Sequence, residues 1–160
     1  MRTFGLIGKN LSHSFSEIFF KEKIIKEKIS NTRYLNYELA EISEFLDLII
    51  QKNISGLNVT IPYKESIIPY LDELTEEAKI ISAVNTIEFI GEKFIGHNTD
   101  TIGFRKSIIP LLKNRKKAII LGSGGSSKAV QYSLDILNIE YVIIGRNTCI
   151  SYTDMNSEFI

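Results

Sequence analysis

Short apolar runs alternate with amphipathic segments along most of this chain, and this alternation limits its fold more than any other feature of the sequence. Residues 3–8, 34–39 and 54–60 are short apolar runs of the kind that form buried strands. Residues 14–29 and 42–50 lie between them and carry apolar side chains at helical spacing. Strands that alternate with helices usually pair in parallel and are buried between those helices. We therefore predict an α/β fold whose N-terminal part is an open, mixed, mainly parallel sheet.

The next part of the chain extends this sheet. Residues 64–71 and 75–82 are predicted to form two short helices. Residues 83–89 and 94–98 are apolar and β-branched, and the sequence IGEK between them suits a tight turn, which predicts an antiparallel hairpin. We expect this hairpin to close a first domain at residues 1–99.

Residues 100–160 are predicted to form a connecting helix and an incomplete dinucleotide-binding domain. Thr99 or Asp100 can cap the helix, and Pro110 is expected to kink or end it. A strand, a glycine-rich turn, a second helix and a second strand follow. Only 14 mostly polar residues come after Arg146, whereas such a domain usually needs several parallel strands.

The sequence GSGGSS lies directly between a predicted strand and a predicted helix, which is the context that the dinucleotide fingerprint requires. Gly122 permits the tight turn, and Gly124 lets the backbone approach a pyrophosphate. Free N–H groups of the helix would face that phosphate. Ser127 replaces the usual third glycine, and a purely structural turn is the alternative. The turn predicts these cofactor-binding residues: Gly122, Ser123, Gly124, Gly125 and Ser126.

A basic residue follows the second strand of this unit. About 20 residues after the glycine turn, NAD-binding folds often place an acidic side chain on the ribose 2′-hydroxyl, but here the chain reads Gly145, Arg146, Asn147, Thr148. A guanidinium can clamp a 2′-phosphate with two hydrogen bonds. We therefore predict NADP as cofactor, bound also by Arg146, Asn147 and Thr148, with an ordinary surface arginine as the alternative.

Polar side chains also gather in the first domain. Ser14 and Ser16 stand at the start of a predicted helix, where they can hold a small carboxylate or simply cap the helix. Asn58 and Thr60 end a buried strand and Lys64 comes shortly after it, which places polar side chains at the carboxyl edge, where open α/β sheets bind ligands.

Two further polar residues interrupt apolar runs. A buried amide such as that of Asn85 needs a hydrogen-bonding partner or a ligand. Asp100 is favoured by its position alone as a helix N-cap, and spacing alone does not show whether it pairs with Lys64.

Composition excludes several classes of protein. The chain has 19 basic and 19 acidic residues, so it offers no field for holding nucleic acid or an anionic membrane. It has no apolar stretch near the roughly 18 residues that a membrane helix needs. Cys149 is the single cysteine, and with two histidines it is too little for a zinc site of these ligands. We expect a cytoplasmic protein without a metal.

Six short blocks of sequence span essentially the whole chain. They are GLIG at 5–8, SHSFS at 12–16, GLNVTIPYK at 56–64, AVNT at 83–86, GHNTDTIGF at 96–104 and GSGGSS at 122–127. In their order and approximate intervals these blocks resemble the shikimate dehydrogenase family. The resemblance implies a substrate domain followed by the start of a Rossmann NADP-binding domain. It also implies reversible reduction of 3-dehydroshikimate to shikimate by NADPH, in aromatic amino acid biosynthesis.

The resemblance also implies roles for single residues. Lys64 and Asp100 would be the catalytic pair, and Ser14 and Ser16 would bind the substrate carboxylate. The ring hydroxyls would be held, together with Lys64, by Asn58, Thr60, Asn85 and Asp100.

Some positions depart from the family pattern. Glu17 replaces a common proline, and family members continue well beyond residue 160. If these 160 residues are the whole polypeptide, we expect weak binding and poor catalysis. We expect the protein to be a monomer or a homodimer. The alternatives are an NAD-using quinate or shikimate dehydrogenase and a noncatalytic small-molecule-binding module.

Overall fold

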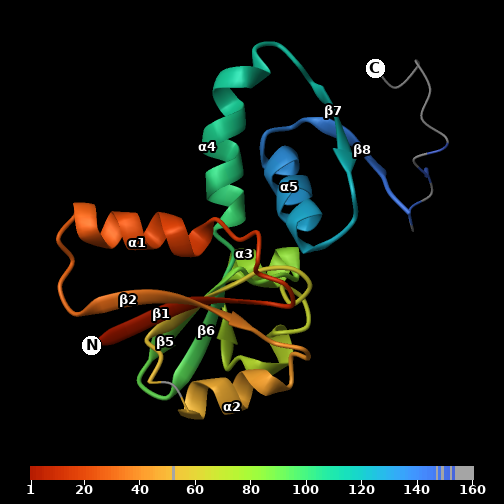
Figure 1. Cartoon of the computed structure of the whole chain (residues 1–160). Helices are drawn as coiled ribbons and strands as arrows, with labels where there is room; N and C mark the ends of the chain where they lie inside the picture. Colours follow the sequence, from red (N-terminus) through yellow and green to blue (C-terminus); the bar gives the residue numbers. More distant parts are fainter. Residues whose placement is uncertain (52, 147, 149, 152, 154–160) are drawn as a thin grey trace.

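The computed structural model describes residues 1–51, 53–146, 148, 150, 151 and 153 (Figure 1). Within these residues the strands form one six-stranded sheet and one two-stranded sheet. In chain order the elements are β1 (Arg2–Gly8), α1 (Ser16–Lys26), β2 (Thr32–Glu38), α2 (Glu44–Gln51), β3 (Gly56–Val59), the 3₁₀ turn η1 (Ile68–Tyr70), β4 (Glu73–Leu74), α3 (Glu76–Ile81), β5 (Thr86–Ile90), β6 (Lys93–His97), α4 (Asp100–Leu112), β7 (Lys117–Leu121), α5 (Gly125–Ile136) and β8 (Glu140–Ile144).

The larger sheet is mixed, in the order β2-β1-β3-β5-β6-β4. Strand β1 pairs in parallel with β2 and β3, and β4 pairs in parallel with β6. The predicted hairpin is confirmed, because β5 runs antiparallel to β3 and to β6. The parallel arrangement puts the carboxyl ends of β1 and β3 at the same edge of the sheet.

The two faces of this sheet differ because side chains alternate along each strand. One face carries the main core, in which Ile7, Leu57 and Ile87 pack against Phe45 of α2. The opposite face is covered by α1 over β1 and β2, where Tyr34 belongs to a smaller buried cluster. The rest of that face, over β3 and β5, carries polar side chains.

The smaller sheet consists of β7 and β8 in parallel, and α5 connects the two strands. Ile120 and Leu134 are buried between α5 and the strands, and Phe104 of α4 packs against them. Val130 and Leu137 join the same cluster. Figure 1 shows α4 rising from the larger sheet toward α5 and the β7–β8 pair.

The helix predicted at residues 64–71 is wrong. This segment forms turns and the 3₁₀ turn η1, with i to i−3 hydrogen bonds such as Tyr70 N to Ile67 O at 2.9 Å. The apolar spacing suits a helix, but Pro69 has no N–H to bond the carbonyl of Glu65. The short strand β4 that follows was not predicted.

Pro110 does not end α4, which continues to Leu112. Pro110 lies in the last turn, and both Pro110 and Lys106, whose carbonyl loses its helical partner, are exposed. Water can therefore satisfy that carbonyl.

Among the described residues, no helix combines the length and the apolar character needed to cross a membrane.

Candidate active site

A cavity of about 910 Å³ opens at the carboxyl ends of β1 and β3. Ligands bind at this edge in open α/β sheets because the strands deliver loops and helix N-termini there. The cavity wall includes seven of the residues singled out from the sequence: Ser14, Ser16, Asn58, Thr60, Lys64, Asn85 and Asp100.

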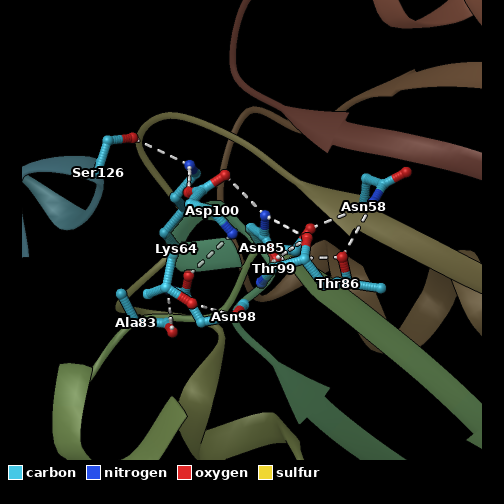
Figure 2. A network of polar contacts seen from close by, with 10 residues as sticks. Asn58, Lys64, Ala83, Asn85, Thr86, Asn98, Thr99, Asp100 and Ser126 are labelled. Carbon is cyan, nitrogen blue, oxygen red and sulfur yellow. Dashed lines mark hydrogen bonds and ion pairs between the residues drawn. The ribbon is translucent and has the colours of Figure 1, made fainter. Parts of the chain in front are cut away.

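Lys64 lies between Asp100 and Ser126 in the network of polar contacts shown in Figure 2. Its backbone carbonyl accepts from Val84 N at 2.7 Å, which ties the turn after β3 to the start of β5. Its Nζ donates to Asp100 Oδ2 at 2.6 Å and to Ser126 Oγ at 3.0 Å. The side chain is only 12% exposed. Because an ammonium has three donors, one is left for a ligand in the cavity.

Asp100 is not the helix cap that its position alone favoured. It is the first residue of α4, and the N-cap is Thr99, which makes no side-chain capping bond. The Asp100 carboxylate instead accepts from Lys64 Nζ and, through Oδ1, from Asn85 Nδ2 at 2.8 Å. Asn98 Oδ1 accepts from the backbone N–H of Asp100 at 3.2 Å, so a neighbouring side chain satisfies the first turn.

Asn85, directly before β5, connects the start of that strand to the start of α4. Its Oδ1 accepts from Thr99 N at 2.9 Å, and its Nδ2 donates to Asp100. A backbone N–H is a fixed donor, so these two bonds define how the amide is turned. The amide therefore orients the Asp100 carboxylate toward Lys64.

Asn58 lies in β3 and Thr60 directly follows that strand, and both residues line the cavity. Asn58 Nδ2 donates to Thr86 Oγ1 at 3.1 Å on the neighbouring strand. Thr60 packs closely against Gly8, where an added Cβ would lie 2.7 Å from the Thr60 methyl group. The sequence pattern did not single out Tyr34, whose hydroxyl donates to Asn58 Oδ1 at 2.8 Å. In the sequence, Tyr34 is only a tyrosine in a predicted strand, and nothing there points to its contact with Asn58.

The two serines lie at the start of α1. Ser14 Oγ accepts from Ser16 N at 3.3 Å, while the N-cap position itself is occupied by Phe15. Both serines are partly buried and line the cavity, and His13 is exposed beside them. Hydroxyl groups and the N-terminus of an 11-residue helix together favour an anionic group at this end of the cavity.

The glycine turn has the geometry that a dinucleotide phosphate needs. Gly122 has φ of 110°, in the region that favours glycine, and its N–H donates to Ile144 O at 2.8 Å. An added Cβ on Gly124 would meet no atom within 4 Å, so the backbone there is open to a ligand. Helix α5 starts at Gly125, directly after this open position. These residues fit a bound pyrophosphate.

The glycine turn also lies against Lys64. A Cβ added to Gly125 would lie 3.1 Å from the Cβ of Lys64 and 3.5 Å from that of Ala83. One helical turn further, Lys128 forms an ion pair with Glu65. The N-terminus of α5 is therefore packed on the turn after β3, and it contacts Lys64 of the cavity wall.

The residues after β8 lie beside the glycine turn. A Cβ added to Gly145 would be 3.7 Å from the Cα of Gly122, and Arg146, which follows it, is exposed. The hydroxyl of Thr148 contacts Gly145 O at 3.0 Å and Ile150 O at 2.6 Å, so it stabilises this loop. Asn147, also predicted to bind the cofactor, lies outside the described residues.

Comparisons with known proteins agree with this geometry. Residues 6–87 match the family model described as the shikimate dehydrogenase substrate binding domain. The chain is 40% identical over 148 residues to shikimate dehydrogenase (NADP(+)) of Pyrococcus abyssi, covering 91% of this chain and 55% of that protein. The chain thus spans about half the length of the curated relatives it matches.

Solved structures show the same similarity. Shikimate dehydrogenase 1 from Peptoclostridium difficile has 37% identity and a TM-score of 0.84, covering 93% of this chain and 57% of that one. Shikimate 5-dehydrogenase from Thermus thermophilus, solved in complex with NADP(H) and shikimate, has 26% identity and a TM-score of 0.78, covering 92% and 57%.

Proposed function

We propose that this chain, which belongs to the shikimate dehydrogenase family, acts in the NADP-dependent reversible reduction of 3-dehydroshikimate to shikimate. One observation carries the proposal. The Lys64–Asp100 pair, at 2.6 Å, lines a cavity that also holds the predicted substrate-binding residues, and Lys64 touches the first turn of the nucleotide helix.

The cavity is suited to a small polyhydroxylated acid. Ser14 and Ser16, at the N-terminus of α1, would bind the carboxylate. Asn58, Thr60 and Asn85 line the cavity wall along β3 and β5 and would contact the ring hydroxyls. Hydrogen-bonding groups at fixed positions select for ligands whose hydroxyls match them.

Lys64 would stabilise the charge that develops in the reaction. NADPH, when bound, supplies the hydride for reduction of the ketone carbon. The oxygen of that carbonyl then carries negative charge, and the Lys64 ammonium has one donor free to bind it. A positioned proton donor near this oxygen completes its conversion to a hydroxyl.

Asp100 would hold the ammonium in place and contact the same hydroxyl. Its two carboxylate oxygens accept separately from Lys64 and Asn85, which fixes the carboxylate in two directions. A group held in this way loses little freedom when the substrate binds, and this positioning contributes to catalysis.

The turn between β7 and α5 would hold the cofactor. The open backbone at Gly124 and the N-terminus of α5 would bind the pyrophosphate, assisted by Gly122, Ser123, Gly125 and Ser126. Arg146 is exposed beside this turn and would bind the 2′-phosphate of NADP, with Asn147 and Thr148 nearby in the chain.

The domain division belongs to the same proposal. Residues 1–99 would form the substrate-binding domain, and residues 100–160 a linker helix and the start of the dinucleotide-binding domain. This division is supported by the two separate sheets. A cytoplasmic location, and assembly as a monomer or homodimer, remain predictions.

Calorimetry with shikimate tests the proposal directly. We expect saturable binding to this chain that a Ser14→Ala/Ser16→Ala double variant weakens strongly, because the carboxylate loses both hydroxyls. Ser12→Ala is a matched control, since Ser12 is exposed, bonds Asn10 Oδ1 at 2.7 Å and lies outside the cavity wall. Absence of binding at millimolar shikimate, both to this chain and to any longer form of the protein, would exclude this function.

An assay of 3-dehydroshikimate reduction with NADPH then separates the enzyme from a noncatalytic module. Reduction that requires Lys64 supports the enzyme. Shikimate binding without any turnover in a longer form of the protein, one with more of the dinucleotide-binding domain, would favour the binding module.

A further inference from the structure

Tyr34 lies beneath the cavity wall and contacts one of its residues. It comes from β2, is 3% exposed and stacks on Phe20 of α1 with ring centroids 4.3 Å apart. Its hydroxyl reaches across β1 and lies 2.8 Å from Asn58 Oδ1. A phenylalanine would fill the same space and stack in the same way. What the hydroxyl group adds is therefore its hydrogen bond to Asn58.

The direction of each hydrogen bond around Asn58 can be worked out from a fixed donor. The backbone N–H of Thr99 donates to Asn85 Oδ1, so that atom is an acceptor. The Thr86 hydroxyl donates its single proton to the same oxygen, at 3.1 Å.

Since its proton is used, Thr86 Oγ1 must accept from Asn58 Nδ2, at 3.1 Å. The amide oxygen of Asn58 therefore faces Tyr34, and Tyr34 is the donor in their bond.

Among the described residues, these hydrogen bonds leave Asn58 with one free hydrogen-bonding position. Its Nδ2 donates to Thr86 and also lies 3.4 Å from the carbonyl of Asn85. Its Oδ1 uses one lone pair for Tyr34, so the second lone pair is available. Asn58 lines the cavity, and a ligand group that meets this lone pair must be a donor.

We propose that Tyr34 is a positioning residue that holds Asn58 as a hydrogen-bond acceptor for a hydroxyl group of the substrate. This inference rests on the proposed function, in which the ligand is a polyhydroxylated ring acid. Tyr34 acts only through Asn58 and makes no contact with the ligand itself.

Two further observations support this role. Asn58, Phe20 and Tyr34 also line a second cavity of about 460 Å³ on the same face of the sheet, so the Asn58 amide has space to turn away from the substrate. Burial, and to a lesser extent the charge of Glu17, raises the pKa of the Tyr34 hydroxyl well above its usual range. The hydroxyl therefore stays protonated and remains a donor at any physiological pH.

The first test needs no ligand. Tyr34→Phe keeps the ring and removes only the donor. We expect the side-chain ¹⁵N order parameter of Asn58, measured by NMR, to fall in this variant. Tyr63→Phe is the matched control, because Tyr63 is also buried and its hydroxyl donates to Leu39 O at 2.7 Å, away from Asn58. An unchanged order parameter in Tyr34→Phe would overturn the positioning role.

The second test is a double-mutant cycle with shikimate as the probe. We expect Tyr34→Phe to weaken shikimate binding about fivefold in the native background, the worth of one net hydrogen bond. In an Asn58→Ala background the same substitution should change affinity less than about 1.5-fold, because the residue it acts through is gone. Tyr63→Phe should leave affinity unchanged in both backgrounds.

The outcomes separate the two proposals. An equal loss of affinity in both backgrounds, or no loss in either, would show that Tyr34 does not act through Asn58. If neither the unsubstituted chain nor any longer form of it binds shikimate, the proposed function fails, and the Asn58 order parameter alone decides whether Tyr34 positions that amide.

Discussion

Lys64 and Ser126 are 62 residues apart in the sequence, yet Lys64 Nζ lies 3.0 Å from Ser126 Oγ. The first residue follows a strand of the larger sheet, and the second lies in the first turn of the helix that would bind the cofactor phosphate. One ammonium therefore borders both the cavity at the sheet edge and the glycine turn. A substitution at either residue should affect both sites.

Ser126→Ala should reduce the effect of NADPH binding on shikimate binding. Lys64 loses one of its two acceptors, and we expect kcat to fall by up to about fivefold, because Ser126 is exposed and water replaces part of the bond. Shikimate affinity measured with and without NADPH should show a smaller difference than in the unsubstituted chain. Ser126→Thr retains the hydroxyl and should restore both values.

Ser107→Ala provides the control for that experiment. Ser107 is an exposed serine of α4 whose hydroxyl donates to Phe104 O, far from Lys64 in the hydrogen-bond network. If Ser107→Ala and Ser126→Ala lower kcat equally, the contact with Lys64 is not the cause.

Lys64→Met should abolish most of the catalysis while leaving the fold intact. The stem of Lys64 packs on the start of α5, so methionine preserves that contact and removes only the ammonium. We expect kcat to fall at least about a hundredfold with a much smaller change in shikimate affinity. Absorbance of NADPH at high enzyme concentration measures the rate. Lys93→Met, at an exposed lysine of β6, should have no effect, and near-normal turnover of Lys64→Met would remove Lys64 from the mechanism.

Asp100→Asn should destabilise the chain as well as slow it. The substitution leaves the Lys64 ammonium, which is 12% exposed, without its counter-charge. We expect the free energy of unfolding in urea to fall by about 1–2 kcal/mol, less than for a fully buried pair because Asp100 is partly exposed. Glu73→Gln breaks an ion pair of similar length on the exposed surface and should cause no measurable change. Equal effects of the two substitutions would contradict a special role for the Lys64–Asp100 pair.

Most of the site could be predicted because its residues stand at the ends of strands. Asn58 lies near the end of β3, Lys64 follows that strand, and Asn85 precedes β5, so the topology of an α/β sheet brings them to one edge. The alternation of apolar runs also predicted most of the strands and helices, with boundaries shifted by a few residues. These features depend on local periodicity, which a single sequence contains.

Other features depend on contacts that no local pattern records. Tyr34 is a plain strand tyrosine until the fold brings its hydroxyl to Asn58, 24 residues away. The Asp100 carboxylate is free to bind Lys64 and Asn85 because the side chain of Asn98 accepts from the backbone N–H at the start of α4. The contact of Gly125 with Lys64 likewise exists only because α5 packs on α3 and on the turn after β3.

Arg146→Ala should change the choice of cofactor. A guanidinium bound to the 2′-phosphate distinguishes NADP from NAD, and a charge-assisted hydrogen bond is worth about 1.5–3 kcal/mol. We therefore expect the affinity for NADPH to fall about 10–100-fold and that for NADH to stay within about twofold. Fluorescence titration of both nucleotides gives the ratio. Arg115→Ala removes an exposed arginine that contacts Leu111 O and should leave the ratio unchanged, whereas an equal loss of both nucleotides in Arg146→Ala would exclude recognition of the 2′-phosphate.

Two neighbouring glycines should respond differently to the same added methyl group. Gly124 has φ of −82°, which alanine adopts readily, and open space around its Cβ position. Gly124→Ala should therefore leave the free energy of unfolding unchanged or slightly increased, because it reduces the freedom of the unfolded chain. The methyl group would occupy the position where the pyrophosphate approaches, so NADPH binding should fall at least tenfold while shikimate binding stays the same.

Gly125→Ala tests the other side of the same turn. Its methyl group would lie 3.1 Å from the Cβ of Lys64, closer than ordinary carbon contacts, so α5 or Lys64 must shift by a few tenths of an ångström. Such a shift moves the ammonium relative to Asp100, and we expect a loss of kcat of about tenfold or more because small misplacements are costly in catalysis. A crystal structure of the variant measures the shift. Unchanged turnover with Lys64 displaced would show that the exact separation of the glycine turn and Lys64 does not matter for the reaction.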